Sequence, residues 1–514
     1  MSGQSASPGA STLLHQLPAR QAARQAQATA LWWRGRAIDY GTLNKQVLSL
    51  AGRLAGTGVR GDRVAVLAWN CPEFVALIYA VPASGRILVP LNARLAPAEW
   101  IYQLQAAGVT TLLGDADLLQ PLLQHPDFPE TITVIDLHKD YVSWLETGPV
   151  GTLPPAAADD PVWILYTSGS TGRPKGAVLT HRSFMAGLHS AALGRPVQPN
   201  DRYLYPFPLF HVAAHNVLLQ HQHGAAVILC RSFDATETLH ACRELQVTTM
   251  SLAPTMIAML LDHPQFSRAD LSTVRTIGYG ASAMPETLLR RLLAETDVGL
   301  CQSYGMTELS GSVAFLTVTD HQRATQERPE LLQSVGKPLP TVEIKLVSDT
   351  AQACAPGERG EILVKASQCM REYWQQPAET ADALRDGWLH TGDIGRFDTE
   401  GYLYIVDRKK DMIISGGENI ASREVEEVLR RHPAVRDCAV IGLPHPRWGE
   451  TPCAVVQLIA DTSDAALDDH CRQWLAAYKT PKRWIRVAAL PLNAAGKVDK
   501  PSLRHIYGEN SPGH

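Results

Sequence analysis

A short run of glycine and hydroxyl residues is the densest group of chemistry-bearing side chains in this sequence. The segment Leu165–Gly176 reads Leu-Tyr-Thr-Ser-Gly-Ser-Thr-Gly-Arg-Pro-Lys-Gly. Gly169 and Gly172 allow tight turns that leave backbone N–H groups facing an anion, the hydroxyl groups add donors, and Lys175 adds a positive charge. Such a loop suits a polyphosphate. The residues predicted to line it are Thr167, Ser168, Gly169, Ser170, Thr171, Gly172 and Lys175.

The surroundings of this loop favour a phosphate site over a simple linker. The apolar run Val162–Tyr166 predicts a buried strand directly before the loop. A Walker A loop is excluded, because that motif needs Gly-Lys-Ser/Thr, whereas Lys175 follows a proline and precedes a glycine. The loop therefore predicts a polyphosphate site of another type.

Six further motifs accompany this loop in a fixed order. They are Leu88-Val-Pro-Leu-Asn92, Tyr304-Gly-Met-Thr-Glu308, Gly387-Trp-Leu-His-Thr-Gly-Asp393, Asp407-Arg-Lys-Lys-Asp411, Ser415-Gly-Gly-Glu-Asn419 and Gly496-Lys497. Together with the loop, they make the chain resemble the AMP-forming acyl-CoA synthetases of the acyl-adenylate-forming ligase superfamily. The resemblance covers about residues 29–503, which is nearly the whole chain.

This resemblance implies an adenine nucleotide beside the phosphate loop, with ATP as a substrate. Tyr304 offers an aromatic face on which adenine can stack, although a tyrosine in isolation is typical of a core position. The small residues Gly280 and Ala281 let the base approach the backbone, and Gly305 adjoins Tyr304 in the same motif.

The ribose and metal positions also depend on the resemblance. Asp393 matches the family residue that accepts hydrogen bonds from both ribose hydroxyls, and Arg408 follows a strand from which it can reach the ribose. Thr307 and Glu308 offer the oxygen ligands that Mg²⁺ prefers. In isolation, a Thr-Glu pair is typical of a helix start and a Thr-Gly-Asp run is typical of a turn.

Lys497 is the residue that the resemblance implies to be catalytic, together with Thr307 and Glu308. A carboxylate repels the triphosphate that it must attack. A lysine that contacts both the carboxylate and the α-phosphate oxygens offsets these charges and stabilises the pentavalent transition state. Outside the family motif, a lysine near the C-terminus is typical of a solvated surface.

Two other motifs imply a second half-reaction. Family members rotate a small domain between adenylation and thioester formation, and Lys410 occupies the hinge position. Gly416 and Gly417 match positions that line the tunnel for coenzyme A, where absent side chains leave room for its pantetheine arm. In isolation, this glycine pair indicates a turn, and the two interpretations are compatible.

Four histidines lie close together in the sequence. His211 and His215 have the i, i+4 spacing of a zinc-binding helix, and His221 and His223 follow. Position 212 is valine instead of the glutamate of H-E-x-x-H, and no third ligand is evident, so the pattern does not predict zinc. The resemblance implies instead that His211 is the aromatic gate residue of the acyl pocket.

The acid substrate is less closely defined. Amino-acid-activating relatives place an aspartate shortly after the residue that matches Phe210, whereas residues 210–216 contain no acidic side chain. An uncharged fatty or aromatic tail is therefore favoured, and Ala213 and Ala214 leave room for a chain or a ring. Medium-chain fatty acids and aromatic acids, such as cinnamates or benzoates, both stay open.

The predicted activity is that of an ATP-dependent carboxylic acid–CoA ligase. The acid and Mg·ATP form an acyl-adenylate and pyrophosphate, and coenzyme A then displaces AMP. Two rivals stay open: an acyl-AMP ligase that loads the phosphopantetheine of a carrier protein, and luciferase-like oxidation of the adenylate. A catalytically silent nucleotide-binding regulator is disfavoured, because Lys497, Glu308 and Asp393 are all present.

A regulatory partner is implied by the last motif. The segment Pro491–Lys497 resembles the sequence around the reversibly acetylated lysine of bacterial family members. Acetylation would remove the charge that adenylation needs, so a lysine acetyltransferase is a predicted partner. The sequence leaves the oligomeric state open.

The elements that must position these motifs alternate between strand and helix patterns. Apolar runs at 63–68 and 87–91 predict buried strands, and helical patterns at 43–54 and 97–107 alternate with them. This rhythm indicates βα units and a largely parallel sheet. It returns with strands at 226–229, 248–252 and 273–279 and helices at 236–245, 254–261 and 285–295. Beyond about residue 331 the pieces are shorter: strands at 342–347, 360–364, 401–405 and 437–442, and helices at 423–431 and 464–477.

The predicted fold class is α/β, with a large N-terminal multi-subdomain α/β body and a small mobile C-terminal α+β domain. We expect residues 1–28 to be a flexible lead-in and residues 29–407 to form the AMP-binding and acyl-binding domain. Residues 408–514 are expected to form the C-terminal domain that carries Lys497.

Composition narrows the class of protein. With 514 residues, of which 45% are hydrophobic and 19% charged, the chain is globular in type. A net charge of −4 offers no basic field for nucleic acid. Nine cysteines without a C-x-x-C pair do not indicate a disulfide scaffold. The first thirty residues lack an apolar targeting core, and Pro82, Arg86 and Pro90 interrupt the most apolar stretch, so we expect a cytoplasmic protein without membrane insertion.

Overall fold

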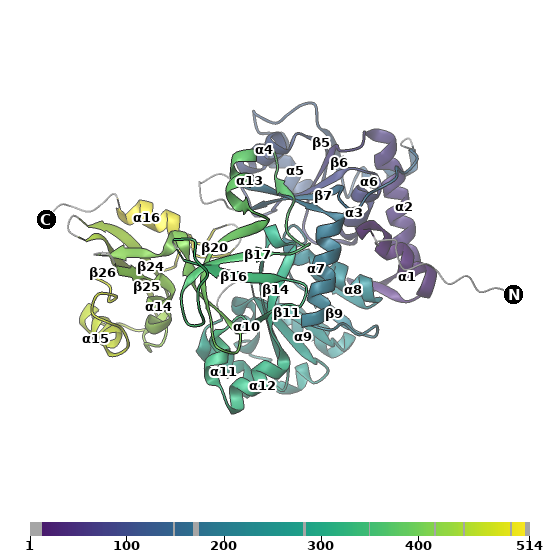
Figure 1. Ribbon diagram of the computed structural model, residues 1–514. Coiled ribbons are helices and arrows are strands. Elements are labelled where there is room, and N and C mark those ends of the chain that lie inside the picture. Colours follow the sequence, from purple (N-terminus) through teal and green to yellow (C-terminus); the bar gives the residue numbers. More distant parts are fainter. Residues whose placement is uncertain are drawn as a thin grey trace.

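A computed structural model describes residues 13–147, 150–167, 174–280, 284–348, 350–415, 418–445, 448–493 and 496–508, with the side chains of 418 and 419 left aside. A large body holds three sheets, and a small domain with a fourth sheet lies against one side of it (Figure 1). The predicted α/β class, with a large body and a smaller C-terminal domain, is confirmed.

The first sheet of the body carries the phosphate loop at one edge. Its central strands are parallel and consist of apolar runs buried on both faces. The strand order is β18 (Glu372–Tyr373), β8 (Lys175–Thr180), β7 (Pro161–Thr167), β4 (Ile87–Pro90), β3 (Arg63–Leu67), β5 (Val109–Gly114) and β6 (Thr133–Asp136). The helices between these strands in the chain are α3 (Pro72–Ala83), α4 (Pro97–Ala107), α5 (Ala116–Leu123) and α6 (Tyr141–Thr147). The predicted strands at 63–68 and 87–91 and the helix at 97–107 are confirmed.

The second sheet has nine strands and a largely parallel centre. In order across the sheet these are β15 (Lys337–Pro338), β14 (Gly311–Leu316), β13 (Gly299–Met306), β12 (Thr276–Gly280), β11 (Thr249–Leu252), β9 (Arg202–Tyr205), β10 (Ala226–Leu229), β1 (Thr29–Trp33) and β2 (Arg36–Asp39). One face packs in a core with α9 (Ala235–Leu245), α10 (Pro254–Leu261), α11 (Glu286–Glu295) and α12 (Val318–Gln326).

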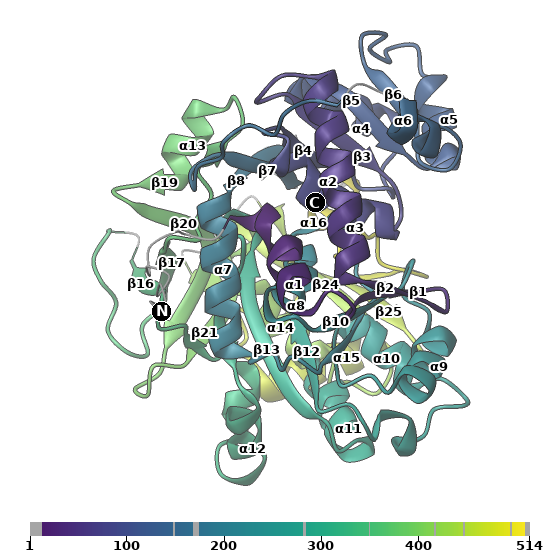
Figure 2. The same ribbon diagram turned by 90° about the vertical axis from the view of Figure 1, so that its right-hand side faces the viewer.

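The opposite face of this sheet joins a core that continues to the first sheet. That core contains side chains from α2 (Tyr40–Thr57), α3, α7 (His181–Gly194) and α8 (His215–His223), together with strands of both sheets. Figure 2 shows α7 running from β8 toward the foot of β13, so this helix connects the phosphate edge of one sheet with the face of the other.

Two sheets remain: the last sheet of the body, and the sheet of the small domain. An antiparallel sheet joins β16 (Glu343–Val347), β17 (Gly360–Lys365), β20 (Trp388–Phe397), β19 (Leu384–Arg385) and β21 (Leu403–Arg408), with α13 (Pro377–Ala383) beside it. The small-domain sheet joins β23 (Glu418–Ile420), β22 (Ile413–Ser415), β25 (Gly449–Leu458), β24 (Val435–His445) and β26 (Arg483–Arg486). Its helices are α14 (Ser422–Leu429), α15 (Asp464–Trp474) and α16 (Lys500–Gly508).

The expectation of a flexible lead-in over residues 1–28 is wrong for the part of it that the structure describes. Leu14 starts a 3-10 turn that leads into α1 (Leu17–Gln25). Leu14 and Leu17 are buried, and the amide groups of Gln21 and Gln25 donate to the carbonyls of Gln222 and Gly224. The Ser- and Gln-rich composition concealed a short apolar stripe, which is enough to pack a helix against α8. Residues 1–12 lie outside the described part.

The apolar stretch over residues 74–91 forms most of α3 and all of β4, and both elements are buried in the body. Within the described residues, no helix is both long and apolar enough to cross a membrane.

Candidate active site

The described residues that flank the phosphate loop lie at the loop end of a β-hairpin, formed by β7 and β8. Thr167 ends β7 and lies opposite Lys175, the first residue of β8. The predicted loop residues Ser168, Gly169, Ser170, Thr171 and Gly172 lie outside the described part of the chain, as do Ala281, Gly416 and Gly417. The hairpin therefore brings two of the predicted phosphate contacts to one end of the first sheet.

Glu308 lies opposite this hairpin, on the second sheet. A 3-10 turn over Thr307–Leu309 follows β13 directly and places the Glu308 carboxyl group in a buried position. The hydroxyl of Thr167 donates to Glu308 Oε1 over 3.3 Å, and the hydroxyl of Tyr373 donates to the same oxygen over 2.9 Å. The Lys175 ammonium lies 5.3 Å from the centre of the Tyr373 ring. Two sheets thus meet at one buried carboxylate.

Tyr304 lies on β13, four residues before Glu308 in the chain. Its hydroxyl donates to Asp393 Oδ2 over 2.6 Å, and burial beside that carboxylate raises the pKa of Tyr304 well above its usual value. A Cβ on Gly305 would collide with the carbonyl oxygen of Gly311, and one on Gly280 would come within 2.6 Å of the Ser303 carbonyl oxygen. The two glycines are therefore required by close backbone packing around Tyr304.

Asp393 is held by partners from two strands. Asp393 on β20 is the register partner of Arg408 on β21, and Arg408 Nε lies 2.6 Å from Asp393 Oδ1. The other carboxylate oxygen accepts the Tyr304 hydroxyl, and the backbone N–H of Asp393 donates to the Thr391 hydroxyl. The carboxylate is buried, whereas the guanidinium is partly open to solvent. The Asp393 carboxylate is therefore a hydrogen-bond acceptor held in a fixed position beside the Tyr304 ring.

Lys497 is presented by a tight turn of the small domain. The N–H of Asn493 donates to the Lys497 carbonyl, the N–H of Lys497 donates to the Asn493 side chain, and Gly496 adopts a φ of +74° that favours glycine. The residue keeps solvent-accessible surface. Desolvation of its ammonium group is nevertheless the main cause that lowers the pKa of Lys497, and the charge of Arg408 lowers it further.

The ammonium group of Lys497 is close to the groups already described. Asp393 and Glu308 act on it as counter-charges that raise the pKa of Lys497, whereas Lys410 acts with Arg408 in the opposite direction. The turn of the small domain therefore places its lysine among the nucleotide-site residues of the body.

His211 lies within electrostatic range of Lys497. Its ring contacts Phe210 edge-on at 4.9 Å between centroids, and Phe210 contacts Trp69 in the same way at 6.3 Å. Burial is the main cause that lowers the pKa of His211 to about 4, and the positive charges of Arg94 and Lys497 lower it further. His211 is thus neutral near pH 7 and belongs to an aromatic wall within reach of Lys497.

The other histidines of the sequence pattern have structural partners. His221 is buried, with the Tyr79 hydroxyl 2.7 Å from Nδ1 and the Ala30 carbonyl oxygen 3.2 Å from Nε2. Among the residues that the structure describes, no group of three His, Cys, Asp or Glu side chains is arranged to hold a metal ion.

The connection to the small domain is anchored on both sides of Lys410. Lys409 forms an ion pair with Glu361 of the body at 3.0 Å, and Asp411 forms one with Arg504 of α16 at 2.8 Å. Lys410 lies between these two anchors, in a 3-10 turn over Lys409–Asp411. Among the residues that the structure describes, Lys410 forms no ion pair with either domain, and it is the residue that the sequence predicts as the hinge.

Comparison with known families accounts for this geometry. Residues 18–374 match the family described as AMP-binding enzyme, and residues 424–497 match the AMP-binding enzyme C-terminal domain. The chain belongs to this family. Its body carries the hairpin, Glu308, Tyr304 and His211, and its C-terminal domain carries Lys497.

Several relatives of this family match most of the chain. A feruloyl-CoA synthase of Amycolatopsis sp is 37% identical over 96% of this chain and 98% of its own length. A long-chain-fatty-acid–CoA ligase of Mycobacterium tuberculosis is 35% identical over 92% of this chain and 94% of its own. The chain is thus an AMP-forming acyl-CoA synthetase by family.

A solved structure of the family has the same fold. The o-succinylbenzoate CoA synthetase from Bacillus subtilis, in complex with its acyl-adenylate intermediate, superposes with a TM-score of 0.86 at 32% identity, covering 95% of this chain and 98% of that one. The same synthetase has been solved with ATP and a magnesium ion.

The residues of this acyl-CoA synthetase fit a magnesium ion. The Thr167 hydroxyl and the buried Glu308 carboxylate supply oxygen donors 3.3 Å apart. Within the described chain, no lysine or arginine forms an ion pair with Glu308, so its charge stays available for a cation. Both oxygens lie at the end of the phosphate hairpin, where a metal ion would meet the phosphates.

Sequence reasoning did not identify Tyr373. This residue lies on the short edge strand β18, which pairs with β8, and it connects Lys175 with Glu308 through its ring and its hydroxyl. It lies 65 residues beyond Glu308 in the chain, and no spacing or composition signal marks it.

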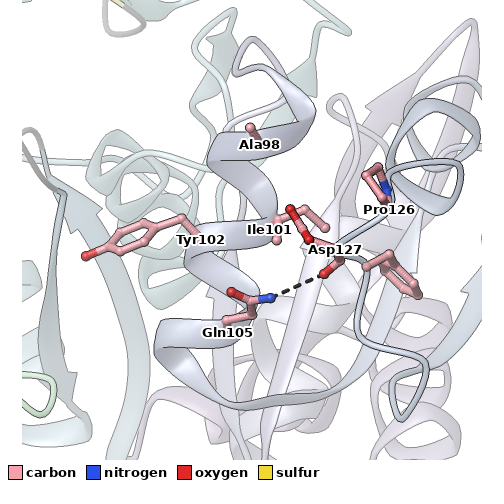
Figure 3. Close-up of a pocket in the computed structure, with 7 residues that line it drawn as sticks. Ala98, Ile101, Tyr102, Gln105, Pro126 and Asp127 are labelled. Atoms are coloured by element: carbon pink, nitrogen blue, oxygen red, sulfur yellow. Dashed lines mark hydrogen bonds between the residues drawn. The ribbon is translucent and has the colours of Figure 1, made fainter.

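A separate cavity of about 540 Å³ lies outside this cluster, against α4 (Figure 3). Gln105 on α4 donates to the Asp127 carbonyl across it over 3.2 Å. Tyr102 of the same helix donates to the Pro174 carbonyl at the base of the phosphate hairpin. The cavity therefore lies beside α4, the helix that contacts the phosphate hairpin through Tyr102, and it is not lined by the residues around Lys497.

Proposed function

We propose that this synthetase activates a carboxylic acid with ATP and transfers the acyl group to coenzyme A. The observation that carries the proposal is the position of Lys497, which lies among Asp393, Arg408, Glu308 and His211. One cation is thereby shared between a nucleotide site and an aromatic acyl wall, as a reaction between an acid and a nucleotide requires.

The nucleotide is held by side chains of the body. Asp393 accepts hydrogen bonds from the ribose hydroxyls, with Arg408 keeping its carboxylate ionised and oriented. Tyr304 contributes its ring to adenine and its hydroxyl to Asp393. Thr167, Lys175 and the loop between them bind the phosphates. Glu308, with Thr307 beside it in the chain and the Thr167 hydroxyl 3.3 Å away, would hold Mg²⁺, which would offset phosphate charge.

Lys497 acts on the first half-reaction. Its ammonium group contacts the acid carboxylate and an α-phosphate oxygen, so that it orients the nucleophile and offsets the charge that develops during in-line attack. The carboxylate oxygen forms a bond to the α-phosphorus, and pyrophosphate leaves with the electron pair of the broken bond. His211 stays neutral and forms part of the wall beside the carboxylate.

The second half-reaction requires removal of Lys497 from the site. We infer rotation about Lys410, because Lys409 and Asp411 can keep their separate ion pairs to Glu361 and Arg504 while the turn between them changes. The proposed boundary between the body, which ends at residue 407, and the C-terminal domain, residues 408–514, falls at this turn. Gly416 and Gly417 then line the path of the coenzyme A thiol, which displaces AMP from the adenylate.

The acid belongs to the fatty or aromatic class. The aromatic wall of Trp69, Phe210 and His211 suits an apolar body next to the carboxylate. Relatives named for ferulate, long-chain fatty acids and succinylbenzoate act on acids of both kinds. Reduced cysteines, all nine of which are unpaired, together with the need for ATP and coenzyme A, support a cytoplasmic location.

Pyrophosphate release tests this function. The purified protein would be incubated with Mg·ATP and a panel of fatty and aromatic acids, with and without coenzyme A. We expect release that depends on the acid, with multiple turnovers only when coenzyme A is present. Turnover that requires a phosphopantetheinylated carrier protein would reassign the acceptor. No acid-dependent release with any member would contradict the proposal.

Acetylation of Lys497 is the regulatory part of the proposal. Gly496 and Lys497 are exposed, and acetylation would remove the charge that binds the carboxylate and the phosphate. Treatment with a lysine acetyltransferase and acetyl-CoA should therefore add one acetyl group at Lys497 and abolish adenylation, as measured by mass spectrometry and pyrophosphate release. An unmodified Lys497, or a modified enzyme with full activity, would contradict this role.

A further inference from the structure

Tyr373 lies on a short segment that joins the phosphate hairpin to the turn of Glu308. The backbone N–H of Met370 donates to the Glu308 carbonyl over 2.7 Å. Two residues on, the segment becomes β18, which pairs with β8, and the N–H of Trp374 donates to the Gly176 carbonyl over 2.7 Å. The segment is therefore hydrogen-bonded both to the sheet of the phosphate hairpin and to the turn that carries Glu308.

The side chain of Tyr373 makes the same connection a second time. Its hydroxyl donates to Glu308 Oε1 over 2.9 Å, and the centre of its ring lies 5.3 Å from the Lys175 ammonium. Burial and the adjacent Glu308 carboxylate raise the pKa of Tyr373, so the hydroxyl keeps its proton near pH 7 and acts as a donor. The backbone N–H of Tyr373 donates to the Thr380 hydroxyl of α13 over 2.9 Å, which fixes the residue further. One aromatic side chain therefore contacts both a metal ligand and a phosphate ligand of the proposed site.

Two hydrogen bonds to the Glu308 carboxylate reach the same oxygen. The Thr167 hydroxyl donates to Oε1 over 3.3 Å, and the Tyr373 hydroxyl makes the shorter bond to it. Among the described residues, the other oxygen of Glu308, Oε2, accepts no hydrogen bond. Two donors on one oxygen fix the plane of a carboxylate and leave its second oxygen for a cation, an arrangement that is common for carboxylate ligands of metals.

We propose that Tyr373 is a positioning residue for the metal and phosphate ligands. Its hydroxyl orients the Glu308 carboxylate for Mg²⁺, and its ring face holds the Lys175 ammonium at the end of the hairpin. The inference rests on the proposed function, because it takes Glu308 as the metal ligand and Lys175 as a phosphate contact. Loss of a hydrogen bond to a metal ligand weakens metal binding on the order of 10–100-fold, and loss of a lysine–aromatic contact costs roughly two- to fivefold.

Two substitutions separate the hydroxyl from the ring. Tyr373→Phe keeps the ring beside Lys175 and removes the donor to Glu308, whereas Tyr373→Leu removes both. Dissociation constants would be measured by calorimetry, without acid or coenzyme A, for three ligands: Mg·ATP, ATP with EDTA, and AMP. AMP lacks the β- and γ-phosphates, so its Kd reports on the adenine, ribose and α-phosphate contacts.

The two variants should differ in which ligand they affect. For Tyr373→Phe we expect the Kd for Mg·ATP to rise roughly tenfold or more, while the Kd values for AMP and metal-free ATP stay within about threefold of wild type. Tyr373→Leu should in addition raise the Kd for metal-free ATP roughly two- to fivefold, because Lys175 contacts phosphate with or without the metal.

Tyr402→Phe is the matched control. The Tyr402 hydroxyl also donates to a carboxylate, Asp320 Oδ1, over 2.6 Å, and the Lys337 ammonium lies 4.4 Å from the centre of its ring. Tyr402 directly precedes β21, Asp320 lies on α12 and Lys337 lies on β15, so all three are outside the residues assigned to the nucleotide site. In this variant we expect all three dissociation constants to stay within about threefold of wild type.

The outcomes separate the positioning role from its alternatives. A rise in the Kd for Mg·ATP of less than about tenfold in Tyr373→Phe would overturn this role. Equal weakening of all three ligands would also overturn it, because it would indicate a structural role, and so would an equal effect in Tyr402→Phe. If Tyr373→Leu does not fold, the nearly isosteric Tyr373→Phe decides. A wild-type protein that binds neither AMP nor Mg·ATP would overturn the proposed function itself.

Discussion

Replacement of Lys497 by alanine should separate the two half-reactions. In the transition state, the ammonium group of Lys497 contacts the attacking carboxylate and the α-phosphate, which makes two charge-assisted hydrogen bonds of about 1.5–3 kcal/mol each. Arg408 remains in place and continues to offset part of the phosphate charge. We therefore expect a loss in the lower half of the combined range, about 4 kcal/mol, which is roughly a 10³-fold slower adenylation.

Thioester formation should respond differently, because Lys497 leaves the site before coenzyme A reacts. The assay is single-turnover: pyrophosphate release from acid and Mg·ATP for the first step, and thioester formation from chemically prepared acyl-adenylate for the second. We expect the second rate to change by less than about tenfold, which corresponds to 1.4 kcal/mol. Lys139→Ala is the control, because Lys139 is an exposed lysine beyond β6.

Two results would refute this reasoning. Adenylation within tenfold of wild type would show that the cation beside Asp393 and Glu308 does not act in the transition state. An equal loss in both half-reactions would show that Lys497 supports the fold of its turn and does not act on adenylation specifically. Thermal unfolding of the variant distinguishes the second case, because a structural role lowers Tm.

Three further predictions concern the nucleotide site, the hinge and pH. Asp393→Asn leaves Arg408 without its counter-charge and weakens the acceptor for ribose, so KM for ATP should rise roughly 100-fold, equivalent to about 3 kcal/mol; an unchanged KM would contradict the ribose role. Lys410→Pro fixes φ at the hinge, so thioester formation should fall at least tenfold while adenylation persists, and loss of adenylation alone would contradict it. The pKa of Lys497 is lowered from 10.5, so kcat/KM for adenylation should fall with rising pH through a value below 10.5 as the ammonium loses its proton. A pH–rate profile with its alkaline limb at or above 10.5 would oppose this assignment.

Acidification should destabilise the fold. Buried histidines such as His221, His215 and His321 have their pKa values lowered to about 4 by burial. The unfolded chain therefore binds more protons than the native one below pH 6.5, and stability falls as pH decreases toward 4. At pH 5 each histidine should contribute a loss of about 2 kcal/mol. Urea unfolding at pH 7.5 and pH 5 measures the difference, and equal free energies of unfolding would contradict it.

The sequence predicted elements that local patterns specify. The apolar run of β3 and the helix α4, with proline at its first position, match the expected ranges because burial and capping are local. The expectation for the lead-in is wrong, because α1 is stabilised by contacts with the end of α8, about two hundred residues away in the chain. Patterns within a window cannot register such contacts.

The same limit applies to the site. Glu308, Asp393 and Lys497 lie on different sheets or domains, so local patterns could not predict that they meet. Only the family resemblance assigned them to one reaction. Tyr373 carries no motif, and only the fold shows that its hydroxyl reaches Glu308 from the edge strand β18.

The central claim is that this chain joins an acid to AMP before the thiol reacts, and oxygen transfer tests it most directly. A substrate acid labelled with ¹⁸O in both carboxylate oxygens would be converted with Mg·ATP and coenzyme A, and the products analysed by mass spectrometry. Attack of the carboxylate on the α-phosphorus predicts that AMP carries one ¹⁸O from the acid and that pyrophosphate carries none. Unlabelled AMP, or label in pyrophosphate or inorganic phosphate, would contradict the acyl-adenylate mechanism.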